Sequence, residues 1–186
     1  MINSCTKPLA ASFLAMVLSL PVSAGDEGDQ VQQLLSVANE ACFVRGGDIS
    51  ALKLQAESEG WKAAPPQELA KHTTAFTEMV GGWTFTNGGV ATAVLQSAFL
   101  PPHSGTVCSI TTKLSSDADH LRVKSGFAEL FGVTIAEEAD SPAEHVDSYW
   151  IDRGQQPPVR TTIIFEKARR ALTLRLIHGS AVPTQS

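Results

Sequence analysis

Five histidines are the residues of this chain best suited to acid–base chemistry or metal binding near neutral pH. They are His72, His103, His120, His145 and His178. None of them belongs to a His-x-His or His-Glu-x-x-His motif, and such motifs place two imidazoles on one metal. The sequence therefore predicts no metal site and no cofactor.

A catalytic role for these histidines requires that several converge in the fold. His72 and His120 lie beside the apolar stripes of predicted helices, which favours packed or edge side chains over ligands. His145 adjoins Glu144 and Asp147 in the sequence, but closeness in sequence does not show contact. A hydrolase-like site assembled from histidine and carboxylate stays open as an alternative, and so does the question of whether the protein is an enzyme.

Other signatures of catalysis and nucleotide binding are missing from the sequence. There is no Gly-x-Ser-x-Gly elbow and no dinucleotide fingerprint. The glycines after Asn87 are not followed by the Lys-Ser/Thr pair of a phosphate loop. The formal net charge is −5 and no run of basic residues occurs, which argues against a nucleic-acid partner.

The cysteines predict a covalent link between distant parts of the chain. Cys42 and Cys108 remain once Cys5, which lies in a predicted leader, is set aside. In an exported chain two cysteines favour one disulfide over two unpaired buried thiols. Their wide spacing argues against a redox-active pair. Closing a loop of this size stabilises the fold by about 4 kcal/mol in the chain-entropy model.

The first 24 residues are typical of a secretory signal peptide. Lys7 precedes an apolar run, 9–20, that is too short to span a bilayer, and Val22-Ser23-Ala24 offers a cleavage site. A retained anchor or a buried first helix is the alternative. Cleavage leaves a single domain over 25–180 and a flexible tail over 181–186, with no membrane span. We therefore expect a periplasmic or secreted protein.

Apolar periodicity predicts helices in the first part of the domain and mostly strands afterwards. The predicted helices are 26–44, a shorter one capped by Asp48 or Ser50, 65–80 and 116–131. The predicted strands are 83–86, 90–100, 107–114, 146–152, 159–166 and 171–177, and 134–144 is interpreted as a mobile acidic loop. This order predicts an α+β fold, in which N-terminal helices pack on a mainly antiparallel sheet of about six strands and one further helix is inserted between strands.

The last two strands predict which face of the sheet is buried. With a four-residue turn over 167–170, three cross-strand pairs share one face: Phe165 with Leu172, Ile163 with Leu174, and Thr161 with Leu176. The opposite face then points away from the helices, and Tyr149 and Ile151 join it if Trp150 turns inward. Tyr and Arg are enriched where binding energy concentrates. The predicted binding residues on this face are Tyr149, Ile151, Arg160, Ile164, Arg175 and Ile177.

A family resemblance rests on three short motifs. They are Ala41-Cys42 at the end of a helix, Gly60-Trp61, and Gly105-Thr106-Val107-Cys108 on a strand. This pattern resembles small uncharacterised exported proteins of Gram-negative bacteria, over roughly the first half of the mature chain. The motifs are structural, and the resemblance implies no activity and no catalytic residues.

The missing catalytic motifs and the mixed sheet face together favour a binding function. We expect a non-catalytic envelope or periplasmic domain that binds another protein or a second copy of itself. The first alternative is a small-molecule-binding domain with its cleft between helices and sheet. The second is the hydrolase-like enzyme with a spatially assembled histidine and carboxylate pair.

Overall fold

The structure is a computed structural model that describes residues 27–45, 48–70, 72–102, 104–152 and 158–179. The predicted signal peptide, 1–24, the predicted tail, 181–186, and His103 lie outside these residues.

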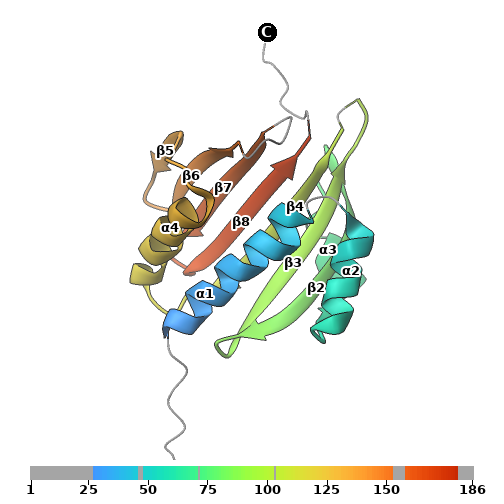
Figure 1. Ribbon diagram of the computed structural model, residues 1–186, viewed down its shortest axis with the longest axis horizontal. Helices are drawn as coiled ribbons and strands as arrows, with labels where there is room; N and C mark the ends of the chain where they lie inside the picture. The colour runs from blue at the N-terminus through green and yellow to red at the C-terminus, as the bar shows by residue number, and fades with distance from the viewer. Residues whose placement is uncertain (1–26, 46–47, 71, 103, 153–157, 180–186) are drawn as a thin grey trace, which may run out of the picture.

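One antiparallel sheet of eight strands forms the body of the protein, in the order β1-β2-β3-β4-β8-β7-β6-β5. The strands are β1 (Lys62–Ala63), β2 (Thr77–Asn87), β3 (Val90–Phe99), β4 (Thr106–Lys113), β5 (Glu137–Asp140), β6 (Glu144–Ile151), β7 (Val159–Glu166) and β8 (Ala171–His178). The helices are α1 (Glu27–Val37), which continues as the π-helical turn η1 (Ala38–Val44), α2 (Ile49–Ser58), α3 (Pro66–Ala70) and α4 (Asp117–Phe131). Figure 1 shows α1, α2 and α4 lying across the same face of the sheet. The predicted α+β fold is therefore confirmed, with α4 as the helix inserted between strands.

The helix ends form where capping residues were predicted. The Asp48 carboxylate accepts hydrogen bonds from the backbone N–H groups of Ser50 and Ala51 and so starts α2. At its other end Gly60 adopts a φ of +69°, and the Trp61 N–H donates to the Ala56 carbonyl at 2.8 Å. This is the left-handed glycine stop of a Schellman motif. Both ends of α2 are thus fixed by local sequence.

The predicted helix over 65–80 is wrong beyond its first turns. Helix α3 ends at Ala70 and strand β2 begins at Thr77. Between them the Thr74 hydroxyl accepts hydrogen bonds from the backbone N–H groups of Phe76 and Thr77, a local turn that competes with helical hydrogen bonding. Met79 and Val80, assigned to a helix face from their spacing, therefore lie in a strand.

Gly81 and Gly82 lie inside β2 rather than at a helix end because other elements approach the strand closely there. A Cβ on Gly81 would lie 2.8 Å from the Ile49 side chain of α2, and a Cβ on Gly82 would lie 2.5 Å from the Leu69 side chain of α3. The two glycines thus let a helix approach each face of β2. This places α3 on the face opposite α2.

Two short strands were not predicted. The expected acidic loop over 134–144 contains β5, which pairs with β6 and whose residues are all exposed. Strand β1 pairs with β2 through only two residues. A strand that is exposed on all its positions has no apolar alternation, so sequence periodicity gives no signal for it.

The core fills the space between the helices and the sheet. Leu34, Leu35 and Ala38 of the first helix lie in the same buried cluster as Ile110 and Leu174 of the sheet. Cys42 and Cys108 are fully buried and form the predicted disulfide between η1 and β4. The three predicted pairs of β7 and β8 also occur in the predicted register.

The disulfide is consistent with an oxidising compartment outside the cytoplasm. Among the described helices, none is both long and apolar enough to cross a membrane.

Candidate functional site

The face of the sheet opposite α1, α2 and α4, which we call the outer face, carries four of the six predicted binding residues. Among the described helices, α3 alone lies on this face. Along β7 and β8, Ile163, Phe165, Leu174 and Leu176 are buried under the helices, and the intervening residues are at least partly exposed. The prediction that Arg160, Ile164, Arg175 and Ile177 face away from the helices is therefore confirmed. Their role in binding stays a prediction.

The expectation for Tyr149 and Ile151 is wrong. Both are completely buried, whereas Trp150 is 46 % exposed. Strand β6 therefore turns Asp147, Tyr149 and Ile151 toward the core. Tyr149 packs against Phe127 of α4 with ring centroids 5.2 Å apart. Burial, and then the nearby Asp147 charge, raise the pKa of Tyr149.

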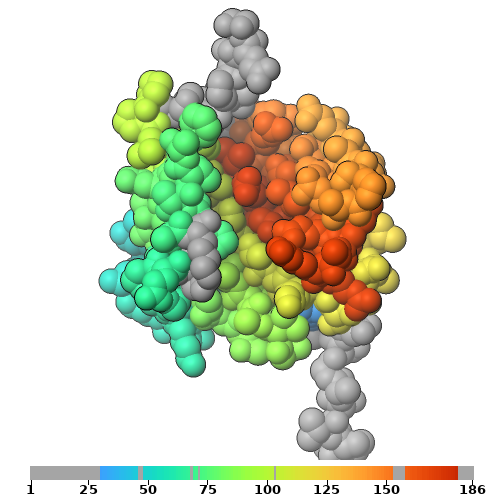
Figure 2. All heavy atoms as spheres, turned by 180° about the vertical axis from the view of Figure 1, so that it is seen from behind, coloured from blue at the N-terminus to red at the C-terminus, as the bar shows by residue number. Residues whose placement is uncertain are grey.

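A hollow of about 460 Å³ lies on the outer face. Its lining residues come from the segment after α3 (His72, Thr74, Phe76) and from strands β2 (Thr77, Met79), β3 (Leu95, Ser97, Phe99), β4 (Val107, Ser109, Thr111), β7 (Glu166) and β8 (Thr173, Arg175, Ile177). Figure 2 shows this face, with the green segments around α3 and the red and orange strands standing on either side of a depression. Two of the predicted binding residues, Arg175 and Ile177, thus line one concave surface.

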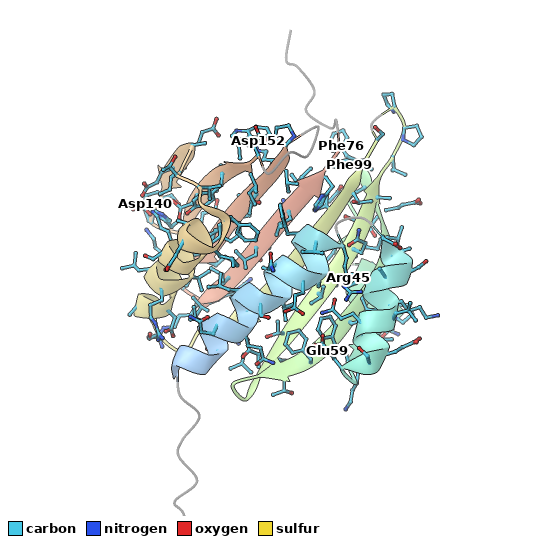
Figure 3. The ribbon with its side chains drawn as sticks, viewed as in Figure 1. Arg45, Glu59, Phe76, Phe99, Asp140 and Asp152 are labelled. Carbon is cyan, nitrogen blue, oxygen red and sulfur yellow. A yellow bond between two sulfur atoms is a disulfide. The ribbon has the colours of Figure 1, made fainter. Side chains whose placement is uncertain are left out.

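The hollow combines an apolar floor with a free cation. Leu95 and Val107 are buried at its base, whereas Phe76 is 65 % exposed at its rim. Figure 3 shows Phe76 and Phe99 together at one end of the sheet, where the Leu100 N–H donates to the Phe76 carbonyl. The Arg175 side chain is exposed and has no hydrogen bond or ion pair with any described residue. Arg160, by contrast, lies over the Trp150 ring at 5.8 Å and contacts Glu137 at 3.8 Å.

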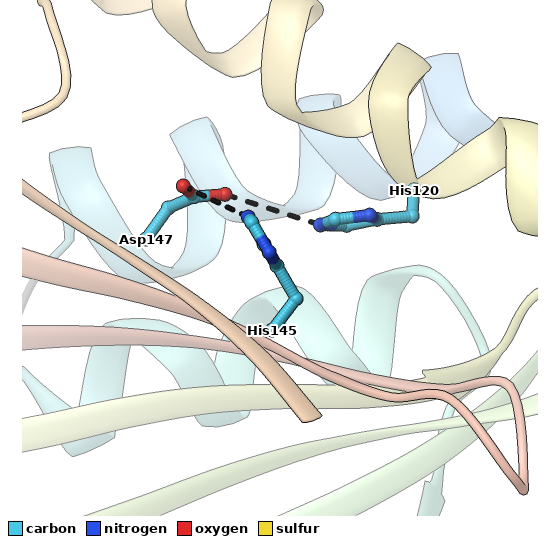
Figure 4. Close-up of side chains that lie close together, drawn as sticks. All are labelled: His120, His145 and Asp147. Atoms are coloured by element: carbon cyan, nitrogen blue, oxygen red, sulfur yellow. Dashed lines mark hydrogen bonds and ion pairs between the residues drawn. The ribbon is translucent and has the colours of Figure 1, made fainter. Parts of the chain in front are cut away.

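A second group, which we call the histidine cluster, consists of His120, Lys124, His145 and Asp147. Figure 4 shows the two histidines and Asp147 pointing toward one another. His120 and Lys124 are one turn apart on α4, and His145 and Asp147 are two apart on β6, so each pair shares a face of its element. The Asp147 Oδ1 atom lies 2.9 Å from Lys124 Nζ and 3.2 Å from His145 Nε2, and Asp147 Oδ2 lies 3.9 Å from His120 Nε2.

Charge balance explains why Asp147 is tolerated with no exposed surface. Lys124 supplies the compensating charge. Partial burial lowers the pKa of Lys124, but the hydrogen bond and charge of Asp147 outweigh this effect and raise it overall. His120 stacks on Phe165 with ring centroids 4.6 Å apart. Burial, followed by repulsion from His145, lowers the pKa of His120, so this ring is neutral near pH 7.

The outer side of the cluster is held by exposed groups of the β5 region. His145 Nδ1 lies 3.2 Å from Asp140 Oδ1, and Lys167 Nζ lies 2.6 Å from the same oxygen. The hydrogen bond from Lys167, followed by that from His145, lowers the pKa of Asp140. Glu138 lies 3.5 Å from Lys124 Nζ and 3.4 Å from His145 Nε2. These carboxylates fix the orientation of the His145 ring.

The convergence that a hydrolase-like site requires occurs, but in the interior. His120 and Asp147 are 8 % and 0 % exposed, and the lining of the hollow includes none of the four cluster residues. The small-molecule alternative expected a cleft between the helices and the sheet. The hollow lies instead on the opposite face of the sheet. The arrangement can hold a cation or stabilise the α4–β6 contact.

The remaining described histidines lie apart from the cluster. His178 ends β8, with its Nε2 2.8 Å from the Cys42 carbonyl oxygen. Burial lowers the pKa of His178, and the hydrogen bond to Cys42 partly opposes this. His72 is exposed at the wall of the hollow.

No protein-family model, curated protein or solved structure matches this chain. The resemblance to small exported proteins therefore stays an expectation.

Sequence reasoning missed Lys124 and the hollow residues Met79 and Phe99. The four-residue spacing of His120 and Lys124 and the two-residue spacing of His145 and Asp147 are signals that a search for shared faces finds. Nothing in the sequence indicates that α4 packs against β6. The two spacings therefore do not show that the four residues form one cluster.

Proposed function

We propose that this protein is an exported, non-catalytic binding domain that holds a partner protein on the outer face of its sheet. The observation that carries the proposal is the hollow, with its apolar floor and the unpaired Arg175. Apolar pockets with a few placed polar groups are the usual form of binding sites. The partner we expect inserts an apolar side chain and places a carboxylate against the guanidinium of Arg175.

The sheet edges favour the face over strand addition as the binding mode. One edge strand, β1, has two residues, and the other, β5, has four, three of which are acidic. Short and charged edge strands discourage pairing with another chain. A partner therefore finds its apolar contact on the face rather than along an edge.

The second candidate is a small amphipathic molecule with an anionic group. It is favoured by the volume of the hollow, about 460 Å³, because sites for small ligands commonly measure about 300–1,000 Å³. The same residues would bind it.

Two substitutions within the hollow and one outside it test the proposal. Ser109 lies in register between Leu95 and Arg175, so Ser109→Trp fills the floor, and Arg175→Ala removes the cation. Arg45→Ala makes the same change of charge at an exposed position outside the hollow. Each variant is expressed in its native envelope with the wild type, and co-purifying proteins and extracted small molecules are quantified by mass spectrometry.

The proposal requires one partner that the wild type and Arg45→Ala retain and that both hollow variants lose. A protein among the lost material supports the first candidate, and a small molecule supports the second. Equal recovery by all variants, with unchanged melting temperatures, removes the hollow as the site.

Export is part of the same proposal and is supported by the disulfide. Mass spectrometry of protein from the native envelope should show an N-terminus at Gly25. An intact Met1 terminus on cytoplasmic protein contradicts export.

A further inference from the structure

The histidine cluster contains two buried polar atoms with no hydrogen-bond partner among the described residues. They are His120 Nε2 and Asp147 Oδ2, and they face each other at 3.9 Å. A buried polar group without a hydrogen bond destabilises the fold. A single group placed between them would satisfy both at once.

We propose that the histidine cluster is a binding site for one Zn²⁺ ion, held by His120 Nε2, His145 Nε2 and the Asp147 carboxylate, which displaces the ammonium group of Lys124. The site is independent of the hollow on the other face, so neither proposal depends on the other.

The spacing of the donor atoms suits a tetrahedral ion. All three ligand atoms lie within 4.8 Å of one another. Zinc–ligand bonds of about 2.0–2.2 Å in tetrahedral geometry place neighbouring ligand atoms roughly 3.3–3.5 Å apart. His145 Nε2 and Asp147 Oδ1 are already 3.2 Å apart. His120 Nε2 lies 3.9 Å from the other carboxylate oxygen, Asp147 Oδ2. The His120 ring and the carboxylate therefore have to close in by about half an ångström or more for one oxygen and both imidazoles to reach the ion.

The donor set selects the metal. Two imidazoles and one carboxylate suit zinc, whereas Ca²⁺ and Mg²⁺ prefer oxygen ligands throughout. The cysteines cannot contribute because they are joined in the disulfide. Glu138 Oε1 lies 3.4 Å from His145 Nε2 and 3.5 Å from Lys124 Nζ.

The groups behind the ligands resemble the outer shell of zinc sites. His145 Nδ1 lies 3.2 Å from Asp140 Oδ1, so a proton on Nδ1 donates to Asp140 and leaves the Nε2 lone pair directed at the ion. This carboxylate–histidine–metal arrangement is common in zinc proteins. The stacking of His120 on Phe165 fixes the second imidazole.

Lys124 occupies the place of a cation. Its Nζ atom lies 2.9 Å from Asp147 Oδ1, 3.5 Å from Glu138 Oε1 and 3.5 Å from His145 Nε2. Its side chain is 20 % exposed, so the ammonium group can withdraw into solvent when zinc enters. Lysine is therefore a built-in competitor, and removing its charge should tighten zinc binding.

The test is a calorimetric titration of metal-stripped mature protein with Zn²⁺ near pH 7.5. The wild type should bind one equivalent. Lys124→Met should bind it about tenfold or more tightly, because the competing charge is gone. His120→Phe, which keeps the ring stack, should weaken binding by roughly a hundredfold. Glu129→Gln, an exposed change on the same helix, should leave the affinity unaltered.

Cobalt(II) provides a second readout, since its visible spectrum reports tetrahedral coordination in the wild type. The proposal is overturned if neither the wild type nor Lys124→Met binds stoichiometric zinc, or if His120→Phe binds it as tightly as the wild type. The first of these results would leave an internal lysine–aspartate pair with a bridging water as the role of the cluster. Should Lys124→Met fail to fold, the wild type and His120→Phe decide the matter.

Discussion

Replacing Lys124 by Met, in the presence of a chelator, should be among the most destabilising single changes in this fold. The substitution keeps the volume of the side chain but removes the ammonium group 2.9 Å from Asp147 Oδ1. Asp147 has no exposed surface and would lose its main compensating charge. Removing one partner of a buried ion pair costs about 3–5 kcal/mol.

The structure places the expected loss at the lower end of that range. The Lys124 side chain is 20 % exposed, so water screens part of the interaction. His145 Nε2 also remains 3.2 Å from the same Asp147 oxygen. We therefore expect a loss of about 3 kcal/mol in the free energy of unfolding, which corresponds to a fall of roughly 6–12 °C in melting temperature for a domain of this size.

Urea unfolding at neutral pH measures this loss, and a double substitution shows its cause. Asp147→Asn with Lys124→Met removes both charges, so the double variant should lose about 2 kcal/mol less than the sum of the single losses. Lys53→Met breaks the exposed pair with Glu57 at 4.0 Å and should change stability by less than about 0.5 kcal/mol. A Lys124→Met variant as stable as the wild type, or additive losses, would refute the charge-balance argument.

Two further predictions concern the disulfide and the dependence of stability on pH. Replacing Cys42 and Cys108 by Ala should lower the free energy of unfolding by about 4 kcal/mol in the chain-entropy model, since the bridge spans 66 residues. Urea unfolding measures this loss. Unchanged stability, or stoichiometric thiol labelling of the unreduced wild type, would contradict the prediction. Burial lowers the pKa of His178 below its ordinary value of 6.5, so its contribution to stability is complete above pH 6.5 and is lost as the pH falls below it. The His178→Gln side chain can still donate to the Cys42 carbonyl but cannot take up a proton. The melting temperature of this variant should therefore fall less steeply between pH 7.5 and 5 than that of the wild type. An equal slope in the two proteins would contradict this.

The sequence predicts an element well where local chemistry alone determines it. Helix α4 begins at the Ser116 cap, whose N–H donates to Asp119 at 2.9 Å, and ends at the left-handed Gly132. Strands β7 and β8 pair in the predicted register because their alternating apolar residues leave one choice of buried face. These signals lie within a few residues of the feature that they predict.

Prediction from sequence fails where contacts with a distant part of the chain determine which face of an element is buried. The face of β6 is the clearest case. Turning Tyr149 and Ile151 inward also buries Asp147, which alternation rules disfavour. That orientation is stable because Lys124 of α4 lies against Asp147. Gly82 similarly suggests a helix end from the sequence alone. In the structure it lies inside β2, because the Leu69 side chain of α3 packs closely against it.

The candidate sites divide in the same way. The outward orientation of Arg175 and Ile177 follows from strand alternation, but the hollow depends on the segment after α3, whose Phe76 lines it beside β2. The histidine cluster joins residues from α4 and β6, and no local spacing in the sequence connects these two elements.

Radical footprinting of Met79 in the free protein and in its partner complex tests the central claim most directly. Met79 lines the hollow, and Leu121 is 60 % exposed on α4, away from it. The binding proposal predicts that Met79 is labelled in the free protein and protected in the complex, with labelling of Leu121 unchanged. Equal labelling of Met79 in both forms, or protection confined to Leu121, would contradict binding at the outer face.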